Sequence, residues 1–149
     1  MTAPATALVS QEGMLNMGRA VLAAQPFSVL LGAELVSFSE AAVELHVPVT
    51  DKVRQQYGFV HGGVVSYAAD NALTYAGGSV LLAPVVTSEF KINYVRPAIG
   101  ERLIARAKAV HVGKTQAVCT CEVFVLFEGI EKLCAIAQGT IAVLPAPTR

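Results

Sequence analysis

A long apolar run at the centre of the chain limits how the chain can fold. Residues 64–76 are mostly Val, Ala, Leu and Tyr, and they follow the sequence His61-Gly62-Gly63. A helix that is apolar on nearly every face belongs in the interior of a protein. We therefore predict a long buried helix here, with the rest of the chain folded round it.

The predicted helix carries one carboxylate, Asp70. No Lys or Arg stands at the positions within helical reach of it, residues 66, 67, 73 and 74. An isolated charge among apolar residues is costly, and such groups are concentrated at functional sites. Asp70 is therefore a candidate catalytic residue, and the alternative is an ordinary aspartate on a helix surface.

Two glycine pairs flank this helix. Gly77-Gly78 are expected to end it, because a left-handed residue commonly follows the last helical turn. Gly62-Gly63 are expected to leave bare backbone N–H groups at the positive end of the helix, where a ligand oxygen can approach.

The spacing of Gly62 and Asp70 predicts an oligomer. They are eight residues apart, which on one helix is about 12 Å along the axis. Groups that act on one carbonyl must each lie within about 3–3.5 Å of their targets. If both residues are catalytic, they are expected to come from different chains of a twofold dimer with antiparallel helices.

Composition indicates one domain over residues 1–149 and excludes several classes of partner. Hydrophobic residues make up 54% and charged residues 15% of the chain, so we expect a large core or apolar surface buried against another subunit. A net charge of zero argues against nucleic acid and acidic membranes. No apolar run reaches the roughly 18 residues of a membrane-spanning helix.

Three cysteines, Cys119, Cys121 and Cys134, make an odd number. We interpret them as small buried residues in a reducing cytosol. The N-terminus has neither a basic start nor a long apolar stretch, so a secretory signal is not expected and the predicted location is cytoplasmic.

The pattern of apolar residues predicts an α+β fold. Ser10 is expected to cap a short N-terminal helix, and residues 27–31 to add one more helical turn. Period-two alternation predicts strands at residues 34–38 and 42–49, and again at 86–94, 103–112, 117–127 and 133–143. The last four are expected to form an antiparallel meander that wraps the helix, with residues 86, 88, 90, 92 and 94 sharing one face.

The motif Gln55-x-x-Gly58-x-x-His61-Gly62-Gly63, with Asp70 nine residues after the histidine, resembles that of the hotdog-fold acyl-CoA thioesterases. The similar branch is the phenylacetic-acid-pathway type, which is related to the arylacyl 4-hydroxybenzoyl-CoA thioesterases. The resemblance covers about residues 27–143. It implies a hotdog fold and hydrolysis of an aryl or short-to-medium-chain acyl-CoA, with coenzyme A as part of the substrate and no other cofactor.

The resemblance also implies roles for single residues. Asp70 would be the nucleophile or the base that activates water, and the Gly62 N–H would stabilise the thioester oxygen. His61 would fix its loop, the rival role being proton chemistry as in related dehydratases. Positions matching further family residues are Gln55, which would bind the carbonyl or water, Thr74, which would hold the attacking water, and Ser88, near the carboxylate.

Substrate contacts are expected from three regions. Gly63 belongs to the bare turn, and Tyr67 and Leu73 are expected to line the acyl pocket together with the N-terminal apolar face. Positions that resemble those near the coenzyme A nucleotide are Lys91, Asn93, Arg96 and Lys114, although cations on strands are usually just solvated. No role is assigned to Asn71.

Two other functions stay open at this point. One is a non-catalytic acyl-CoA sensor on the same scaffold, and the other is an enoyl-thioester hydratase or dehydratase. The sequence implies no metal, since no His, Cys or Asp cluster has ligand spacing. It leaves open the acyl group, coenzyme A against acyl carrier protein, and a dimer against a dimer-of-dimers tetramer.

Overall fold

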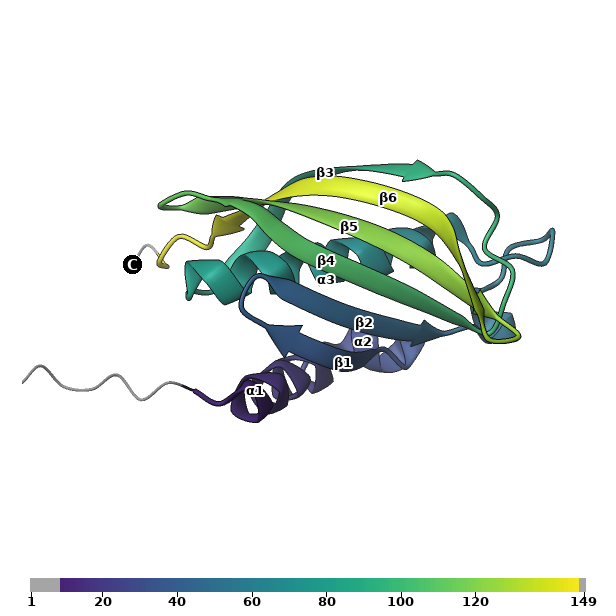
Figure 1. The fold of residues 1–149 in the computed structure, drawn as a ribbon, viewed down its shortest axis with the longest axis horizontal. Coiled ribbons are helices and arrows are strands. Elements are labelled where there is room, and N and C mark those ends of the chain that lie inside the picture. The colour runs from purple at the N-terminus through teal and green to yellow at the C-terminus, as the bar shows by residue number, and fades with distance from the viewer. Residues whose placement is uncertain (1–8, 148–149) are drawn as a thin grey trace, which may run out of the picture.

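The long helix α3, Gly62–Leu81, lies against one face of a six-stranded antiparallel sheet that curves round it (Figure 1). The computed structural model describes residues 9–147. In chain order the other elements are α1 Gln11–Ala23, α2 Pro26–Leu31, β1 Glu34–Ser39, β2 Ala42–Pro48, the short 3-10 helix η1 Asp51–Val53, β3 Val85–Tyr94, β4 Arg102–Val112, β5 Gln116–Phe127 and β6 Ile130–Val143. The predicted α+β fold is confirmed.

Helix α3 is longer than the sequence predicts. Gly77-Gly78 were expected to end it, but the helix continues to Leu81, and its left-handed C-cap is Leu82 with φ 52°. Gly77 has a packing role instead, because a Cβ there would lie 2.5 Å from Ile141 Cβ. The glycine therefore allows the helix to approach strand β6 closely.

The sheet has the strand order β1-β2-β4-β5-β6-β3. The predicted four-strand meander is correct for β4, β5 and β6 but wrong for β3, which pairs with β6 at the far edge of the sheet. The connection of residues 95–101 is long enough to cross three strand spacings, or about 14 Å. It is held at both ends, by Val95 N to Cys134 O at 2.9 Å and Glu101 N to Leu126 O at 2.8 Å.

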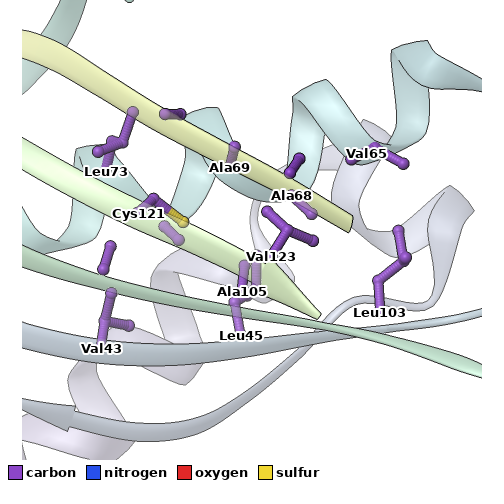
Figure 2. Packing of buried hydrophobic residues seen from close by; sticks show 14 of the residues in the cluster. Val43, Leu45, Val65, Ala68, Ala69, Leu73, Leu103, Ala105, Cys121 and Val123 are labelled. Carbon is purple, nitrogen blue, oxygen red and sulfur yellow. The ribbon is translucent and has the colours of Figure 1, made fainter. Parts of the chain in front are cut away.

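Small residues of α3 bring the helix close to the sheet (Figure 2). Ala68, Ala69 and Ala72 are fully buried. They pack with apolar residues of the strands, among them Val43, Leu45, Leu103, Ala105 and Val123. The predicted burial of the three cysteines is confirmed, and burial raises the pKa of the Cys119 thiol to about 11.

Two short helices precede the sheet. Ser10 caps α1 as predicted, its Oγ accepting from Gly13 N at 3.0 Å, and α1 packs beside β1 (Figure 1). Helix α2 begins with Pro26 and ends at Gly32, whose φ is +69°. No helix within residues 9–147 combines the length and the apolar character needed to cross a membrane.

Candidate active site

One face of α3 is left uncovered by the sheet of its own chain. Tyr67, Asp70, Asn71 and Thr74 are half-buried, whereas the intervening residues Ala68, Ala69, Ala72 and Leu73 are buried. Residues three and four apart are neighbours on a helix surface. The four half-buried side chains therefore form one polar strip along the helix, with Asp70 inside it.

The carboxylate of Asp70 is held from strand β3. Thr87 Oγ1 donates to Asp70 Oδ1 at 2.6 Å, and Thr74 Oγ1, which donates to the backbone oxygen of Asp70 at 2.8 Å, lies 2.9 Å from Thr87 Oγ1. Within residues 9–147 nothing donates to Asp70 Oδ2, and no cation pairs with the carboxylate. One carboxylate oxygen is thus oriented and the other is available.

Thr87 takes the place that the sequence assigned to Ser88. The β3–β6 register shifts between Thr87 and Glu89, which indicates a β-bulge and changes which residues face the helix. Val85 and Thr87 turn inward before the bulge, Phe90 and Ile92 after it, and Ser88 is exposed. The prediction that residues 86–94 keep one parity was therefore wrong at this point, and Ser88 does not contact the acid.

The N-terminus of α3 presents one open amide. His61 Nδ1 accepts from Gly63 N at 2.8 Å, so this ring fixes the turn and the Gly63 N–H is not the bare group that the sequence suggested. The Gly62 N–H has no acceptor within residues 9–147. Gly62 N is therefore the amide that a ligand oxygen can reach at the positive end of the helix.

A cleft of about 290 Å³ opens beside this helix end. It is lined by Gly62, Val65, Tyr94 and Arg96 among others, and Tyr94 OH donates to Gly62 O at 3.1 Å. Arg96 Nη1 donates to Leu133 O at 3.2 Å. The structure thus brings Gly62 and Arg96 together, with a guanidinium at the rim of the cleft.

Gln55 lies in the loop that leads to α3. Its Oε1 accepts from Tyr57 N, and its backbone is paired with Phe59 O at 2.9 Å and Gly58 N at 3.0 Å. Gly58 has φ +91°, a conformation that favours glycine. The Gln55 Nε2 has no acceptor within residues 9–147, so it remains a free donor on this loop.

The four residues expected near the nucleotide do not meet in one chain. Lys91 and Asn93 alternate with the inward Phe90 and Ile92 of β3, and they line a groove of about 550 Å³ on the face of the sheet turned away from α3. Lys114 lies in the β4–β5 turn, at the end of the sheet opposite Arg96. The length of β3 puts these ends about 30 Å apart.

The two residues predicted to line the acyl pocket have different environments. Leu73 is fully buried in the core, packed under the sheet (Figure 2), so it has no surface to offer a ligand. Tyr67 lies on the polar strip, and its ring meets Phe27 of α2 edge-on with centroids 5.2 Å apart. Burial raises the pKa of the Tyr67 hydroxyl, an effect that hydrogen bonds to Ser28 and Asn71 oppose.

Thr87 is the site residue that the sequence analysis missed. A threonine in a predicted strand carries no signal of its own. The resemblance assigned Ser88 to the position near the carboxylate, and the expected alternation put Ser88 on the face shared by residues 86, 90, 92 and 94. Only the bulge in β3 shows that Thr87 faces the helix and Ser88 does not. Gly62 and Asp70 lie on one continuous helix, so the separation of about 12 Å expected from their spacing holds in the structure.

Comparison with known proteins identifies relatives of this chain. The family model described as "Thioesterase superfamily" matches residues 57–126. The chain is 31% identical over 116 residues to 1,4-dihydroxy-2-naphthoyl-CoA hydrolase of Listeria monocytogenes, which covers 76% of this chain and 91% of that protein.

Two further comparisons also identify thioesterases as relatives of this chain. The chain is 33% identical over 94 residues to acyl-coenzyme A thioesterase PaaI of Escherichia coli, covering 62% of this chain and 66% of that one. The crystal structure of a thioesterase family protein from Silicibacter pomeroyi superposes with a TM-score of 0.80 at 37% identity, over 83% of this chain and 93% of that one.

Proposed function

Because the chain belongs to the hotdog-fold thioesterase superfamily, we propose that it hydrolyses acyl-CoA thioesters to a free acid and coenzyme A. The relatives named as hydrolases of 1,4-dihydroxy-2-naphthoyl-CoA and of acyl-coenzyme A support a coenzyme A thioester as substrate. The observation that carries the proposal is Asp70, a carboxylate with one oxygen held by Thr87 and the other open.

Asp70 can act in two ways, and each gives one molecule of free acid and one of coenzyme A. As a base, it takes a proton from water, the water oxygen attacks the thioester carbon, the C–S bond breaks, and the leaving thiolate takes the proton. As a nucleophile, Asp70 attacks the carbon itself and releases coenzyme A, and water then hydrolyses the resulting anhydride. In both cases negative charge develops on the carbonyl oxygen, and a hydrogen-bond donor is needed to stabilise it.

We propose that the donor is Gly62 N of a second chain. Its own chain holds Gly62 and Asp70 eight residues apart on one helix, too far for one carbonyl. The polar strip of α3 is only half-buried, and within residues 9–147 β3 pairs with β6 alone, which leaves a strand edge and the exposed Val86, Tyr94 and Val95. A twofold dimer that covers these surfaces would form two shared sites.

Other residues take supporting roles in this proposal. We propose that Thr74 and the free Nε2 of Gln55 bind the attacking water or the carbonyl, one from each chain of the shared site. Arg96 at the rim of the cleft offers a cation for a phosphate group of coenzyme A. Lys91, Asn93 and Lys114 would reach a nucleotide only if it crosses the outer face of the sheet or a subunit boundary, as in a dimer of dimers.

The proposed reaction uses a carboxylate, water and a backbone amide, and we propose no metal or other cofactor for it. We propose aryl or short-to-medium-chain acyl groups as substrates. The three buried, unbridged cysteines support a reducing compartment, and we place the protein in the cytoplasm.

The test is to incubate the protein with benzoyl-, phenylacetyl-, hexanoyl- and crotonyl-CoA and a thiol reagent. The proposal expects stoichiometric free thiol from at least one of them. Binding without thiol release would indicate a sensor, and loss of enoyl absorbance without thiol would indicate a hydratase. The same acyl groups on acyl carrier protein show which carrier is preferred.

A further inference from the structure

The side chain of Tyr94 lies against the first turn of α3. If a Cβ were added to Gly62, its nearest neighbours would be three atoms of the Tyr94 side chain at 3.5–3.6 Å. Tyr94 OH donates to Gly62 O at 3.1 Å, and both residues line the cleft of about 290 Å³. The backbone of Tyr94 pairs with Ala135 of β6 at the end of β3. The sheet therefore fixes the point from which this ring reaches the helix.

Two successive peptide groups form the start of α3, and three of their four polar ends are held. His61 O accepts from Val64 N at 2.9 Å. Gly63 N donates to His61 Nδ1 at 2.8 Å, and Gly62 O accepts from Tyr94 OH. The fourth end is the Gly62 N–H, which has no acceptor within residues 9–147. The turn thus holds three groups and presents the fourth to a ligand.

A glycine pair at a helix end depends on such bonds for its order. Glycine adopts many backbone conformations and loses the most entropy when it is fixed, and the ends of helices fray. The bonds of His61 to Val64 and Gly63 come from the turn itself, whereas the bond from Tyr94 ties the turn to β3. Tyr94 therefore helps to fix the free N–H relative to the sheet.

We propose that Tyr94 is a positioning residue: its hydroxyl holds the peptide between Gly62 and Gly63, so that the Gly62 N–H meets the thioester oxygen as negative charge develops. This inference rests on the proposed thioesterase function and adds a residue to its machinery. Tyr94 acts through Gly62 and does not touch the reacting atoms. Strand β3 thus orients the amide as well as the carboxylate, which Thr87 holds.

The kinetic test is Tyr94→Phe, which removes the hydroxyl and keeps the ring. Tyr94 is 54% exposed, so this variant should fold. A donor to the developing oxyanion acts mainly in the transition state. For the best of the four acyl-CoA substrates above, kcat should therefore fall by roughly tenfold while KM changes by less than about twofold.

Tyr75→Phe is the matched control. It also removes a tyrosine bond to a backbone oxygen, from Tyr75 OH to Gly18 O at 2.8 Å, but in the buried core. This variant should be less stable than wild type, and its kcat should stay within about twofold. The comparison separates the loss of any such bond from the loss of the bond at Gly62.

Backbone dynamics test the positioning without turnover. NMR relaxation gives order parameters for the amides of Gly62 and Gly63, and a rigid backbone has values of about 0.85. We expect rigid values for both amides in the wild type and in Tyr75→Phe, and clearly lower values in Tyr94→Phe. The amide of Gly129, in the turn between β5 and β6, should not change.

Unchanged order parameters in Tyr94→Phe would overturn the inference, whatever the turnover. An unchanged kcat in an active protein would also overturn it, and so would a raised KM with kcat unchanged, because Tyr94 would then be a substrate contact. Lower order at Gly62 in a protein that hydrolyses none of the thioesters would uphold the hold of Tyr94 on the amide. That result would count against the proposed function alone.

Discussion

Thr87 Oγ1 lies 2.6 Å from Asp70 Oδ1, so a hydroxyl from the edge strand of the sheet holds the single carboxylate of the central helix. The contact depends on the bulge between Thr87 and Glu89, which turns Thr87 inward. It leaves Asp70 Oδ2 without a hydrogen-bond donor within residues 9–147. The geometry of the proposed site therefore depends on both an α-helix and a strand irregularity.

Replacing Thr87 tests this contact. Thr87→Val keeps the shape of the side chain but removes the donor, so the carboxylate should lose its fixed orientation and kcat should fall by roughly tenfold. Ser88→Ala is the matched comparison, since the serine is exposed and turned away, and should stay within about twofold of wild type. If Ser88→Ala has the larger effect, the bulge does not place the residues as described.

Replacing Asp70 tests the proposed chemistry. Asp70→Asn keeps the hydrogen bond from Thr87 and the volume of the side chain, but it can neither take a proton nor attack a thioester. Hydrolysis measured by thiol release should fall by about 100- to 10,000-fold, with an unchanged melting temperature within a few degrees. Near wild-type turnover in this variant would remove Asp70 from the mechanism.

Much of this fold follows from patterns in the sequence, and the exceptions have physical causes. All six strands were predicted from the alternation of apolar residues, and the buried helix from a run that is apolar on nearly every face. The position of β3 was not, because alternation tells which residues form a strand but not which strand it pairs with. Thr87 was missed because the resemblance pointed to Ser88, whereas the bulge between Thr87 and Glu89 changes which residues of β3 face the helix.

The remaining errors came from reading single residues without their neighbours. Gly77 looked like a helix stop, but it is a contact point for Ile141. Leu73 was expected to line the acyl pocket, but it is fully buried in the core. Lys114 and Arg96 lie at opposite ends of long strands, a separation that the sequence does not reveal.

The role of Gly77 can be tested against its neighbour. A methyl group at Gly77 would lie 2.5 Å from Ile141 Cβ, whereas one at Gly78 would meet only Val85 Cγ2 at 3.3 Å. Gly77→Ala should lower the free energy of unfolding by about 1–3 kcal/mol. Gly78→Ala should be neutral or should raise it by up to about 1 kcal/mol, since alanine favours the helix. Equal effects in urea denaturation would show that Gly77 is not a close contact.

The ion-pair network on the outer face predicts part of the response to acid. Arg106 lies 2.9 Å from Glu44 and 2.7 Å from Glu131. Burial would raise the pKa of the Glu44 carboxyl, but its hydrogen bonds to Arg106 and His46 hold it below the ordinary 4.5. The hydrogen bond from Arg106 also lowers the pKa of Glu131. This stabilisation is present above pH 4.5 and is lost as pH falls toward the lower, folded-state values.

Arg106→Gln should therefore flatten the fall in the free energy of unfolding between about pH 6 and pH 3, because the two carboxyls then return toward ordinary values in the folded state. Arg54→Gln is the control, since its partner Asp51 is fully exposed and such pairs contribute little. Urea titrations at several pH values measure both. If the free energy of unfolding of Arg106→Gln falls with decreasing pH as steeply as that of the wild type, the ion pairs of Arg106 do not cause this part of the acid response.

Subunit complementation tests most directly whether two chains share each site. Gly62→Pro removes the proposed donor N–H at the first position of α3, where proline fits, and His61 with ψ 134° already has the conformation preferred before proline. Gly62→Ala, which keeps the N–H and meets only Tyr94 at 3.5 Å, is the control and should stay active.

The decisive measurement is thiol release by an equimolar, subunit-exchanged mixture of the Asp70→Asn and Gly62→Pro proteins, with heterodimers counted by native mass spectrometry. Each protein alone should be nearly inactive. Half of the mixed dimers are hybrids with one intact site of two, so the mixture should recover about a quarter of wild-type activity. Hybrid dimers that form and remain as inactive as their parents would contradict the shared site, as would a protein that is a monomer when active.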